Sequence, residues 1–385
     1  MKRILAAVTG ILLLGLLPLS AGAATLAEAG KSAVLMDVTT GTVLYEHNSH
    51  EALAPASVTK VMTMLLIMEA VDSGKIALTD TVTASEAAAA KGGSQIYLKA
   101  GETMSASDML KSIAVSSAND CACAMAEHIC GSEGAFVEAM NRRAKELGMQ
   151  DTHFVNCTGL DDDDSAKLHR TSAYDIALMS RELLKNHPDI KKYTTIWMDT
   201  VRNGAFGLSN TNKLIRFYPG ATGLKTGYTA GAGYCLSASA QKEGMELIAV
   251  VMGAKTSQAR NAACKELLDY GFANFAVVAP EPEELPQVAV RLGNQTQVPV
   301  RMAETAGMLI EKSQRSGITT EISLEESVAA PVVRGQTLGS LSVKSGEQTL
   351  RQIPLVAAED VERLSTGEIF LAVLRRAAMA KETRE

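Results

Sequence analysis

Residues 55–60 read Pro55-Ala56-Ser57-Val58-Thr59-Lys60, and apolar residues at helical spacing follow them. This pattern predicts a helix from Ser57 to about Ser73. Because residues i and i+3 share a helix face, the Lys60 amine is expected within hydrogen-bonding reach of the Ser57 hydroxyl. A lysine whose pKa is lowered by burial can serve as the base that such a serine needs. The stretch therefore predicts an activated serine at a helix N-terminus, where free backbone N–H groups can stabilise an oxyanion.

A second motif, Ser116-Ser117-Ala118-Asn119-Asp120, lies between two predicted helices. A hydroxyl at Ser117 can relay a proton between Lys60 and a leaving amine. The Asn119 side chain can hold a substrate amide and help to orient Lys60. Taken alone, the motif is more typical of a simple helix cap.

A third motif, Gly223-Leu224-Lys225-Thr226-Gly227-Tyr228, has strand character. A strand edge that carries a cation and a hydroxyl, here Lys225 and Thr226, can bind a substrate carboxylate by charge and hydrogen bonding. Gly227 has no side chain, so a substrate backbone can approach the strand closely. Taken alone, this motif is equally compatible with a turn that carries a surface lysine.

The joint occurrence of the three motifs decides between these alternatives. Ser57-x-x-Lys60, Ser117-x-Asn119 and Lys225-Thr226-Gly227 follow one another in the order typical of penicillin-binding proteins and related β-lactamases. Each motif also lies in the structural context that it requires, namely a helix start, a loop between helices and a strand. The pattern therefore favours acyl transfer through a serine ester.

The chain closely resembles the low-molecular-mass D-alanyl-D-alanine carboxypeptidases, which are serine-type penicillin-binding proteins of the peptidase S11 type. The likeness covers essentially the whole chain and extends to the stretches Leu35-Met36-Asp37, Gly41-Thr42-Val43-Leu44-Tyr45, Ala54-Pro55-Ala56-Ser57, Thr152-His153-Phe154-Val155-Asn156, Gly159-Leu160, Asn210-Thr211-Asn212-Lys213-Leu214 and Val251-Met252-Gly253-Ala254-Lys255. One position departs from the pattern, because relatives often have glycine in place of Ala118. Since Ala118 adds only a methyl group, the chemistry is expected to survive.

The resemblance implies a catalytic role for four residues. Ser57 would form the acyl-enzyme, and Lys60 would be its general base. Ser117 and Asn119 would shuttle protons and position the substrate. The implied reaction is removal of the terminal D-alanine from peptidoglycan pentapeptides, with no cofactor and no metal.

The resemblance also implies how the substrate is bound. Lys225 would bind the terminal carboxylate with help from Thr226, on a strand that continues through Gly227 and Tyr228. The backbone N–H groups of Ser57 and Tyr228 would form the oxyanion hole. The partners are then peptidoglycan stem peptides, and β-lactams would be covalent inhibitors because they present a strained amide and a similar carboxylate.

Two alternative functions stay open on the sequence. A β-lactamase would need a carboxylate that holds a water against the acyl ester, and no Glu occupies a convincing position for it. A non-catalytic wall-binding or sensor protein of the same fold would need neither the Ser57 nucleophile nor the Lys60 base. Both alternatives therefore rank below the carboxypeptidase.

The sequence around the motifs predicts an α/β (α+β) domain in which helices pack on an antiparallel sheet, as in the penicillin-binding and β-lactamase-like transpeptidase fold. Hairpins are expected at residues 32–47 and 233–253, and helices within residues 105–149 and 257–273. We assign this DD-peptidase catalytic domain to residues 24–278.

A change of composition marks a second domain. Residues 279–286 contain three prolines and three acids, which indicates a stiff, solvated linker. Residues 287–357 show short alternating runs broken by Gly, Pro and Asn, which predict a small all-β sandwich.

The N-terminus is typical of export. Lys2 and Arg3 precede an apolar run over residues 4–19, and Ala21-Gly22-Ala23 supplies a small-x-small cleavage pattern. Residues 1–23 therefore predict a secretory signal peptide, with an uncleaved N-terminal anchor as the alternative.

The C-terminal segment, residues 358–385, predicts an amphipathic helix. Its apolar side carries Ile369, Phe370, Val373, Leu374 and Ala377, and its basic residues are Arg375, Arg376, Lys381 and Arg384. This pattern suits a membrane interface with anionic lipid, and an ordinary surface helix or frayed tail is the alternative. We expect an extracytoplasmic protein that is peripheral on the outer face of the cytoplasmic membrane.

The composition excludes other classes of function. Removal of residues 1–23 takes the formal net charge from -6 to about -8, so no basic surface for nucleic acid is expected. The six cysteines form no C-x-x-C pair, and their apolar contexts favour mostly free, buried thiols over disulfides. The acidic run Asp161–Asp164 lacks the ligand spacing of a calcium loop, and His169 and Asp175 are expected to be structural.

Overall fold

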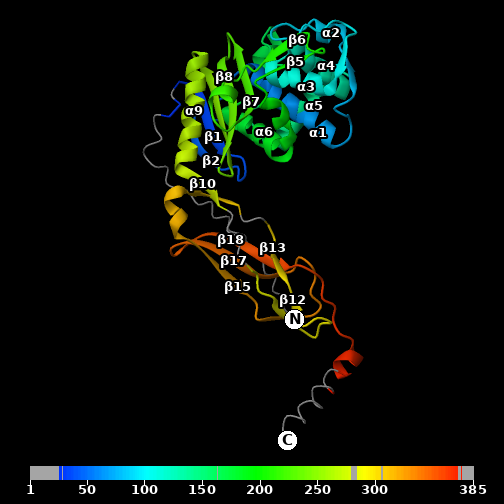
Figure 1. Cartoon of the computed structure of the whole chain (residues 1–385), viewed down its shortest axis with the longest axis vertical. Helices are drawn as coiled ribbons and strands as arrows, with labels where there is room; N and C mark the ends of the chain where they lie inside the picture. The colour runs from blue at the N-terminus through cyan, green and yellow to red at the C-terminus, as the bar shows by residue number, and fades with distance from the viewer. Residues whose placement is uncertain are drawn as a thin grey trace, which may run out of the picture.

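The computed structural model describes residues 26–27, 29–162, 164–278, 284–304, 307–371 and 374. The predicted signal peptide, most of the predicted linker and residues 375–385 lie outside the described residues. Figure 1 shows two units arranged end to end, and the larger one is formed by the N-terminal part of the chain, through the long helix that ends at Asn274.

The larger unit is built on a five-stranded antiparallel sheet. Its strand order is β2-β1-β9-β8-β7. The strands are β1 (Ser32–Asp37), β2 (Val43–His47), β7 (Ala221–Thr229), β8 (Gly233–Lys242) and β9 (Met245–Ala254). The two predicted hairpins are therefore confirmed as β1–β2 and β8–β9.

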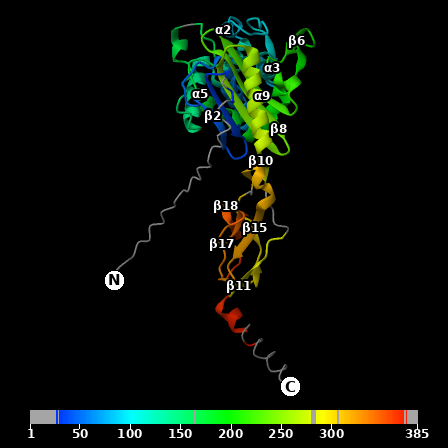
Figure 2. The same ribbon diagram turned by 90° about the vertical axis from the view of Figure 1, so that its left-hand side faces the viewer.

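Helices cover both faces of this sheet because its central strands are apolar on both sides. In β1, Val34 and Met36 join a core with the helices of one face, while Ala33 and Leu35 pack toward the other face. The long helix α9 (Ser257–Asn274) lies along that second face, as Figure 2 shows. The first face is covered by α1 (Lys60–Asp72), α3 (Ala106–Ser116), α4 (Asn119–Cys130), α5 (Glu133–Glu146) and α6 (Ala173–Asn186).

Short side chains define where these helices begin. The hydroxyl of Ser105 accepts the N–H of Asp108 at the start of α3, as the predicted capping box requires. Ser132, Ser172 and Thr256 cap α5, α6 and α9 in the same way. The shorter elements of this unit are β3 (Thr81–Thr83), α2 (Glu86–Ala89), β4 (Thr103–Ser105), α7 (Lys191–Thr194), β5 (Met198–Val201), β6 (Phe206–Ser209) and α8 (Leu214–Phe217).

The smaller unit is the predicted all-β domain. One sheet has the order β12-β11-β16 and the other β13-β18-β17-β15, and each contributes to an apolar core. A ribbon of β10 (Phe275–Val278) and β14 (Met308–Glu311) links the two units. The other strands are β11 (Val288–Arg291), β12 (Gln297–Val298), β13 (Val300–Met302), β15 (Ile318–Leu324), β16 (Ser327–Ala329), β17 (Thr337–Ser345) and β18 (Gln348–Ala357).

The C-terminal segment begins a helix at residues 366–371. This helix lies at the end of the smaller unit that is farther from the larger one, as both views show. Its side chains Phe370, Leu371 and Leu374 are 64%, 55% and 50% exposed. Within the described part of the chain, none of the helices combines the length and the hydropathy that crossing a membrane requires.

Candidate active site

The serine of the first motif lies in a tight turn that precedes α1. Ala56–Thr59 form the 3-10 turn η1, and α1 begins at Lys60 rather than at Ser57 as predicted. The turn is tight because the N–H of Lys60 donates to the carbonyl of Ser57 and the Thr59 hydroxyl donates to the carbonyl of Ala56. Ala56 is buried, whereas Ser57 is only half-buried. Ser57 is thus partly exposed on a backbone that the hydrogen bonds of the turn hold in place.

The Lys60 amine lies directly against this hydroxyl. Its Nζ donates to Ser57 Oγ at 2.9 Å and to the carbonyl of Thr158 at 2.8 Å, and the side chain is fully buried. Burial lowers the pKa of Lys60 to about 7, although the nearby Cys157 and Asp120 favour the charged form. Near neutral pH a large share of Lys60 is therefore a neutral amine that can accept a proton.

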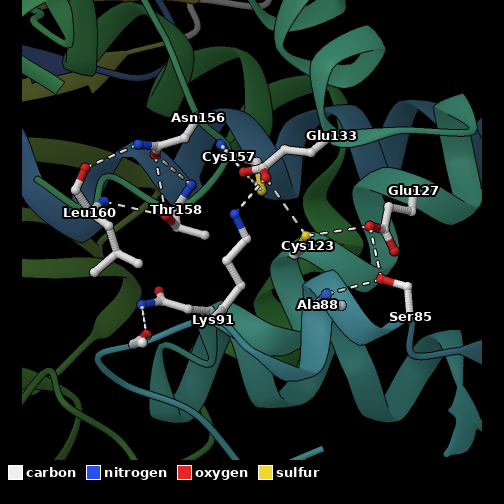
Figure 3. Close-up of polar contacts among 12 residues, drawn as sticks. Ser85, Ala88, Lys91, Cys123, Glu127, Glu133, Asn156, Cys157, Thr158 and Leu160 are labelled. Atoms are coloured by element: carbon white, nitrogen blue, oxygen red, sulfur yellow. Dashed lines mark hydrogen bonds and ion pairs between the residues drawn. The ribbon is translucent and has the colours of Figure 1, made fainter. Parts of the chain in front are cut away.

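The Thr158 carbonyl is held by a turn that the sequence motifs do not include. Asn156 Oδ1 accepts the N–H groups of Thr158 and Gly159, and Asn156 Nδ2 donates to the Leu160 carbonyl (Figure 3). Gly159 has a φ of +80°, and a Cβ there would lie 1.8 Å from the carbonyl oxygen of Ala56. Only glycine therefore lets this turn pack against the Ser57 backbone. The dipeptide Gly159-Leu160 was recognised only as a family likeness.

The second motif lies at the junction of α3 and α4. Ser117 adopts a left-handed conformation with φ 64°, which ends α3. Ser117 Oγ and Asn119 Oδ1 are buried and have no hydrogen-bond partner among the residues that the structure describes. Asn119 Nδ2 donates to the carbonyl of Gly92 at 2.7 Å, and within the described residues no hydrogen bond joins Asn119 to Lys60. Direct orientation of Lys60 by Asn119 is therefore absent from this arrangement.

Asp120, the last residue of the second motif, was not singled out from the sequence. Its carboxylate accepts the N–H groups of Ile96 and Leu98 at 3.1 and 3.0 Å. These bonds fasten the segment after α2 beside Asn119. An acid directly after the motif asparagine was the only sequence signal for this role.

The third motif occupies β7, at the edge of the sheet. Lys225 is buried, and its Nζ donates to the Thr226 carbonyl at 2.9 Å. Burial, together with the charges of Lys60 and Arg260, lowers the pKa of Lys225 well below its usual range. An incoming carboxylate would reverse this effect, because an opposite charge favours the ammonium form. The Thr226 hydroxyl donates to Thr211 Oγ1 at 2.7 Å, and Thr211 was not predicted as part of the site.

The absence of a side chain at Gly227 has a structural role that the sequence did not reveal. A Cβ at Gly227 would lie 2.7 Å from the Pro55 carbonyl and 3.1 Å from the Ser57 nitrogen. The glycine therefore lets β7 approach the Ser57 turn. Tyr228 follows with a side chain that is 56% exposed and packs on Tyr234, with ring centroids 4.3 Å apart. The first and third motifs thus meet at Ser57.

His169 and Asp175 are structural, as expected. His169 Nε2 lies 2.8 Å from the Thr59 hydroxyl, and its Nδ1 accepts the N–H of Val155. Burial lowers the pKa of His169 to about 4, so the ring stays neutral. Asp175 accepts the N–H of Asp151, which anchors the start of α6.

No metal centre is assigned to the described residues. Asp161 and Asp162 line a cavity of about 700 Å³ together with Arg170, and Asp163 lies outside the described residues. In the described part of the chain, Glu69 and Glu182 form the one cluster of ligating groups together with His187. Arg143 already pairs with both of these carboxylates, at 2.7 and 2.6 Å.

All six cysteines are free thiols. Five of them are fully buried, and Cys130 is half-buried. The buried ones are Cys121, Cys123, Cys157, Cys235 and Cys264. They therefore pack as small apolar side chains.

The comparisons with known proteins agree with this geometry. Residues 20–256 match the family model of peptidase S11, D-alanyl-D-alanine carboxypeptidase, and residues 279–363 match the C-terminal domain of penicillin-binding protein 5. The chain is 44% identical to the D-alanyl-D-alanine carboxypeptidase DacF of Bacillus subtilis, over 98% of each chain.

Solved structures give the same result. Penicillin-binding protein 5 from Haemophilus influenzae superimposes with a TM-score of 0.75 at 31% identity, over 87% of this chain and 98% of that one. Penicillin-binding protein D2 from Listeria monocytogenes in its ampicillin-bound form gives a TM-score of 0.58 at 32% identity, over 63% of this chain and 98% of the other. The chain thus belongs to the peptidase S11 family of D-alanyl-D-alanine carboxypeptidases.

Proposed function

We propose that Ser57 is the residue acylated in this D-alanyl-D-alanine carboxypeptidase and that Lys60 is its general base. The observation that carries the proposal is the 2.9 Å contact between Lys60 Nζ and Ser57 Oγ, made by an amine whose pKa burial lowers to about 7. Neutral Lys60 takes the hydroxyl proton while Ser57 Oγ attacks the carbonyl of the penultimate D-alanine.

The remaining motif residues complete the cycle. The proton passes from Lys60 through Ser117 Oγ to the nitrogen of the leaving D-alanine, so that the peptide bond breaks as the serine ester forms. Lys225 and Thr226 bind the terminal carboxylate, and the N–H groups of Ser57 and Tyr228 stabilise the oxyanion. Water then hydrolyses the ester and frees the shortened peptide. Peptidoglycan stem peptides are the substrates, and β-lactams acylate the same serine.

The decisive experiment maps the penicillin adduct. After incubation with benzylpenicillin and digestion, mass spectrometry is expected to find the penicilloyl group on Ser57, and the enzyme is expected to release D-alanine from diacyl-Lys-D-Ala-D-Ala. An adduct on another residue contradicts the assignment. An adduct that turns over within seconds favours the β-lactamase alternative, and acylation without D-alanine release favours a binding role.

We further propose that the protein is exported and is peripheral on the outer face of the cytoplasmic membrane. Residues 1–23 have the pattern of a signal peptide, and the exposed side chains of Phe370, Leu371 and Leu374 precede a basic tail. Because the helix at 366–371 lies at the end of the smaller unit that is farther from the larger unit, a surface can be reached there without contact with the larger unit.

Sedimentation with lipid vesicles tests the membrane proposal. Protein of residues 24–385 is expected to sediment with vesicles that contain phosphatidylglycerol, and a chain that ends at residue 364 is expected to stay in solution. The shortened chain serves as its own control, because it is expected to release D-alanine at the normal rate. Equal sedimentation of both chains contradicts membrane binding. Recovery of the protein from the cytosol of cells, with residues 1–23 still attached, contradicts export.

A further inference from the structure

An ion pair between Lys91 and Glu133 lies next to the backbone segments that contact Lys60 and Asn119. Lys91 Nζ is 2.6 Å from Glu133 Oε2, and the two side chains are 25% and 22% exposed. Lys91 begins the segment after α2, and Glu133 is the first residue of α5, where a negative charge is favoured by the helix dipole. Figure 3 shows the pair beside Cys123 and Cys157. No motif contains either charged residue.

Glu133 holds the backbone that carries the Thr158 carbonyl. Its Oε1 accepts the N–H of Cys157 at 3.3 Å and the thiol of Cys157 at 3.2 Å. On the other side of this residue, the Thr63 hydroxyl of α1 donates to the Cys157 carbonyl at 2.6 Å. The next carbonyl, that of Thr158, accepts the hydrogen bond from Lys60 Nζ. Glu133 is therefore one residue removed from the group that orients the general base.

The backbone that follows Lys91 forms hydrogen bonds with Asn119. The carbonyl of its neighbour Gly92 accepts from Asn119 Nδ2, and the carbonyl of Ser94 accepts the N–H of Asn119, both at 2.7 Å. A Cβ at Gly93 would lie 2.8 Å from Asn119 Nδ2 and 3.1 Å from the Leu160 side chain. The segment that starts at Lys91 therefore packs against both Asn119 and the turn that holds Thr158.

The pair keeps its charges although it is largely covered. Burial alone would raise the pKa of Glu133, but the hydrogen bond and charge of Lys91 outweigh it and lower the pKa below its usual value. Burial likewise opposes the charge of Lys91, and Glu133 raises its pKa nevertheless. The thiols of Cys123 and Cys157 stay protonated, because burial raises the pKa of both. Lys91 and Glu133 thus form a charged pair beside two neutral thiols, and the Cys123 thiol also contacts the Glu127 carboxylate at 3.8 Å.

We propose that Lys91 and Glu133 are positioning residues for the acylation step. Their ion pair links the segment that contains Gly92 to the backbone of Cys157. The first segment holds Asn119, and the second carries the Thr158 carbonyl that holds Lys60. Neither residue touches the substrate. The inference rests on the proposed role of Lys60 as general base, and its effect is on the rate of attack by Ser57 rather than on the binding of the carboxylate.

Stopped-flow acylation by a fluorescent penicillin tests the role of the pair, because it separates the acylation rate constant from the dissociation constant of the non-covalent complex. Lys91→Met is expected to lower the rate constant about tenfold, since loosened segments misplace the base. The dissociation constant is expected to change less than about threefold, because Lys225 and Thr226 are untouched. Lys91→Arg is expected to restore the rate, since a guanidinium keeps the ion pair.

Glu182→Gln is the matched control. The Arg143–Glu182 pair is also 2.6 Å long, its side chains are 22% and 20% exposed, and it joins α5 to α6. Its loss is expected to lower the melting temperature and to leave the acylation rate constant within about twofold of the original. An equal loss of rate in the control, or a failure of Lys91→Arg to restore the rate, overturns the positioning role.

Two further variants keep the result unambiguous. If Lys91→Met does not fold, Lys91→Met with Glu133→Met removes both charges, which a fold tolerates better than one unpaired charge, and the rate is again expected to fall about tenfold. A normal rate in this double variant overturns the inference. Ser57→Ala distinguishes a failure of the proposed function from a failure of the positioning role. If it is still acylated, the proposed function fails, and if it is inert while Lys91→Met reacts normally, only the positioning role fails.

Discussion

Ser57→Ala is expected to abolish both penicillin acylation and D-alanine release. The substitution removes the hydroxyl that lies 2.9 Å from the buried amine of Lys60, so no ester can form on this side chain. Loss of a serine nucleophile in other hydrolases costs several orders of magnitude, and a drop of at least about 10⁴-fold is expected here. The measurement is D-alanine release from diacyl-Lys-D-Ala-D-Ala, together with labelling by fluorescent penicillin.

Ser105→Ala is a suitable control for this variant. Ser105 caps the start of α3, at the opposite end of that helix from Ser117, so its loss is expected to cost about 1 kcal/mol of stability without a change in rate. The Ser57 variant itself is expected to keep its melting temperature, because the serine is only half-buried. D-alanine release above about 1% of the original rate would exclude Ser57 as the nucleophile.

Lys60→Met is expected to lower the acylation rate about 10³-fold, within the range of general-base effects. Methionine fills the space of a fully buried lysine and removes the cost of burying an amine, so the fold is expected to be retained. Acylation by penicillin is measured between pH 5 and pH 9.

The pH profile shows whether the lost group is the base. Because burial lowers the pKa of Lys60 to about 7, the neutral amine becomes scarcer as the pH falls below that value. In the unmodified enzyme, the rate is therefore expected to fall about tenfold per pH unit below about 7 and to level off above it. Lys60→Met is expected to lose this dependence. A variant that is slow but retains the same dependence would assign the titration to another group.

The residues of the candidate site could be proposed from the sequence, because they lie close together in the chain or follow one another in a fixed order of motifs. Ser57 and Lys60 are only three positions apart, and Lys225 lies on a strand, as the character of its motif indicated. The start of α1 was placed wrongly because a 3-10 turn leaves almost the same apolar pattern as an α-helix.

The supporting groups were not predictable from local pattern. The Thr158 carbonyl meets Lys60 across 98 positions of the chain, and a backbone oxygen has no sequence signature. Gly227 was expected to let a substrate backbone approach, and the structure adds a second role, because the glycine also lets β7 pack against Pro55. Lys91 and Glu133 are 42 residues apart, and in the sequence each is indistinguishable from an exposed charged residue. Such contacts arise only when separate segments pack together.

The buried cysteine thiols can be used to detect transient local unfolding of the protein. Cys121 lies in α4, Cys235 in the central sheet and Cys264 in α9, and all three are fully buried. An alkylating reagent reaches a sulfur in such a position only when the surrounding layer opens transiently. Mass spectrometry of alkylation over time therefore reads the free energy of local unfolding separately in each layer. The native sequence provides these probes without any engineered label.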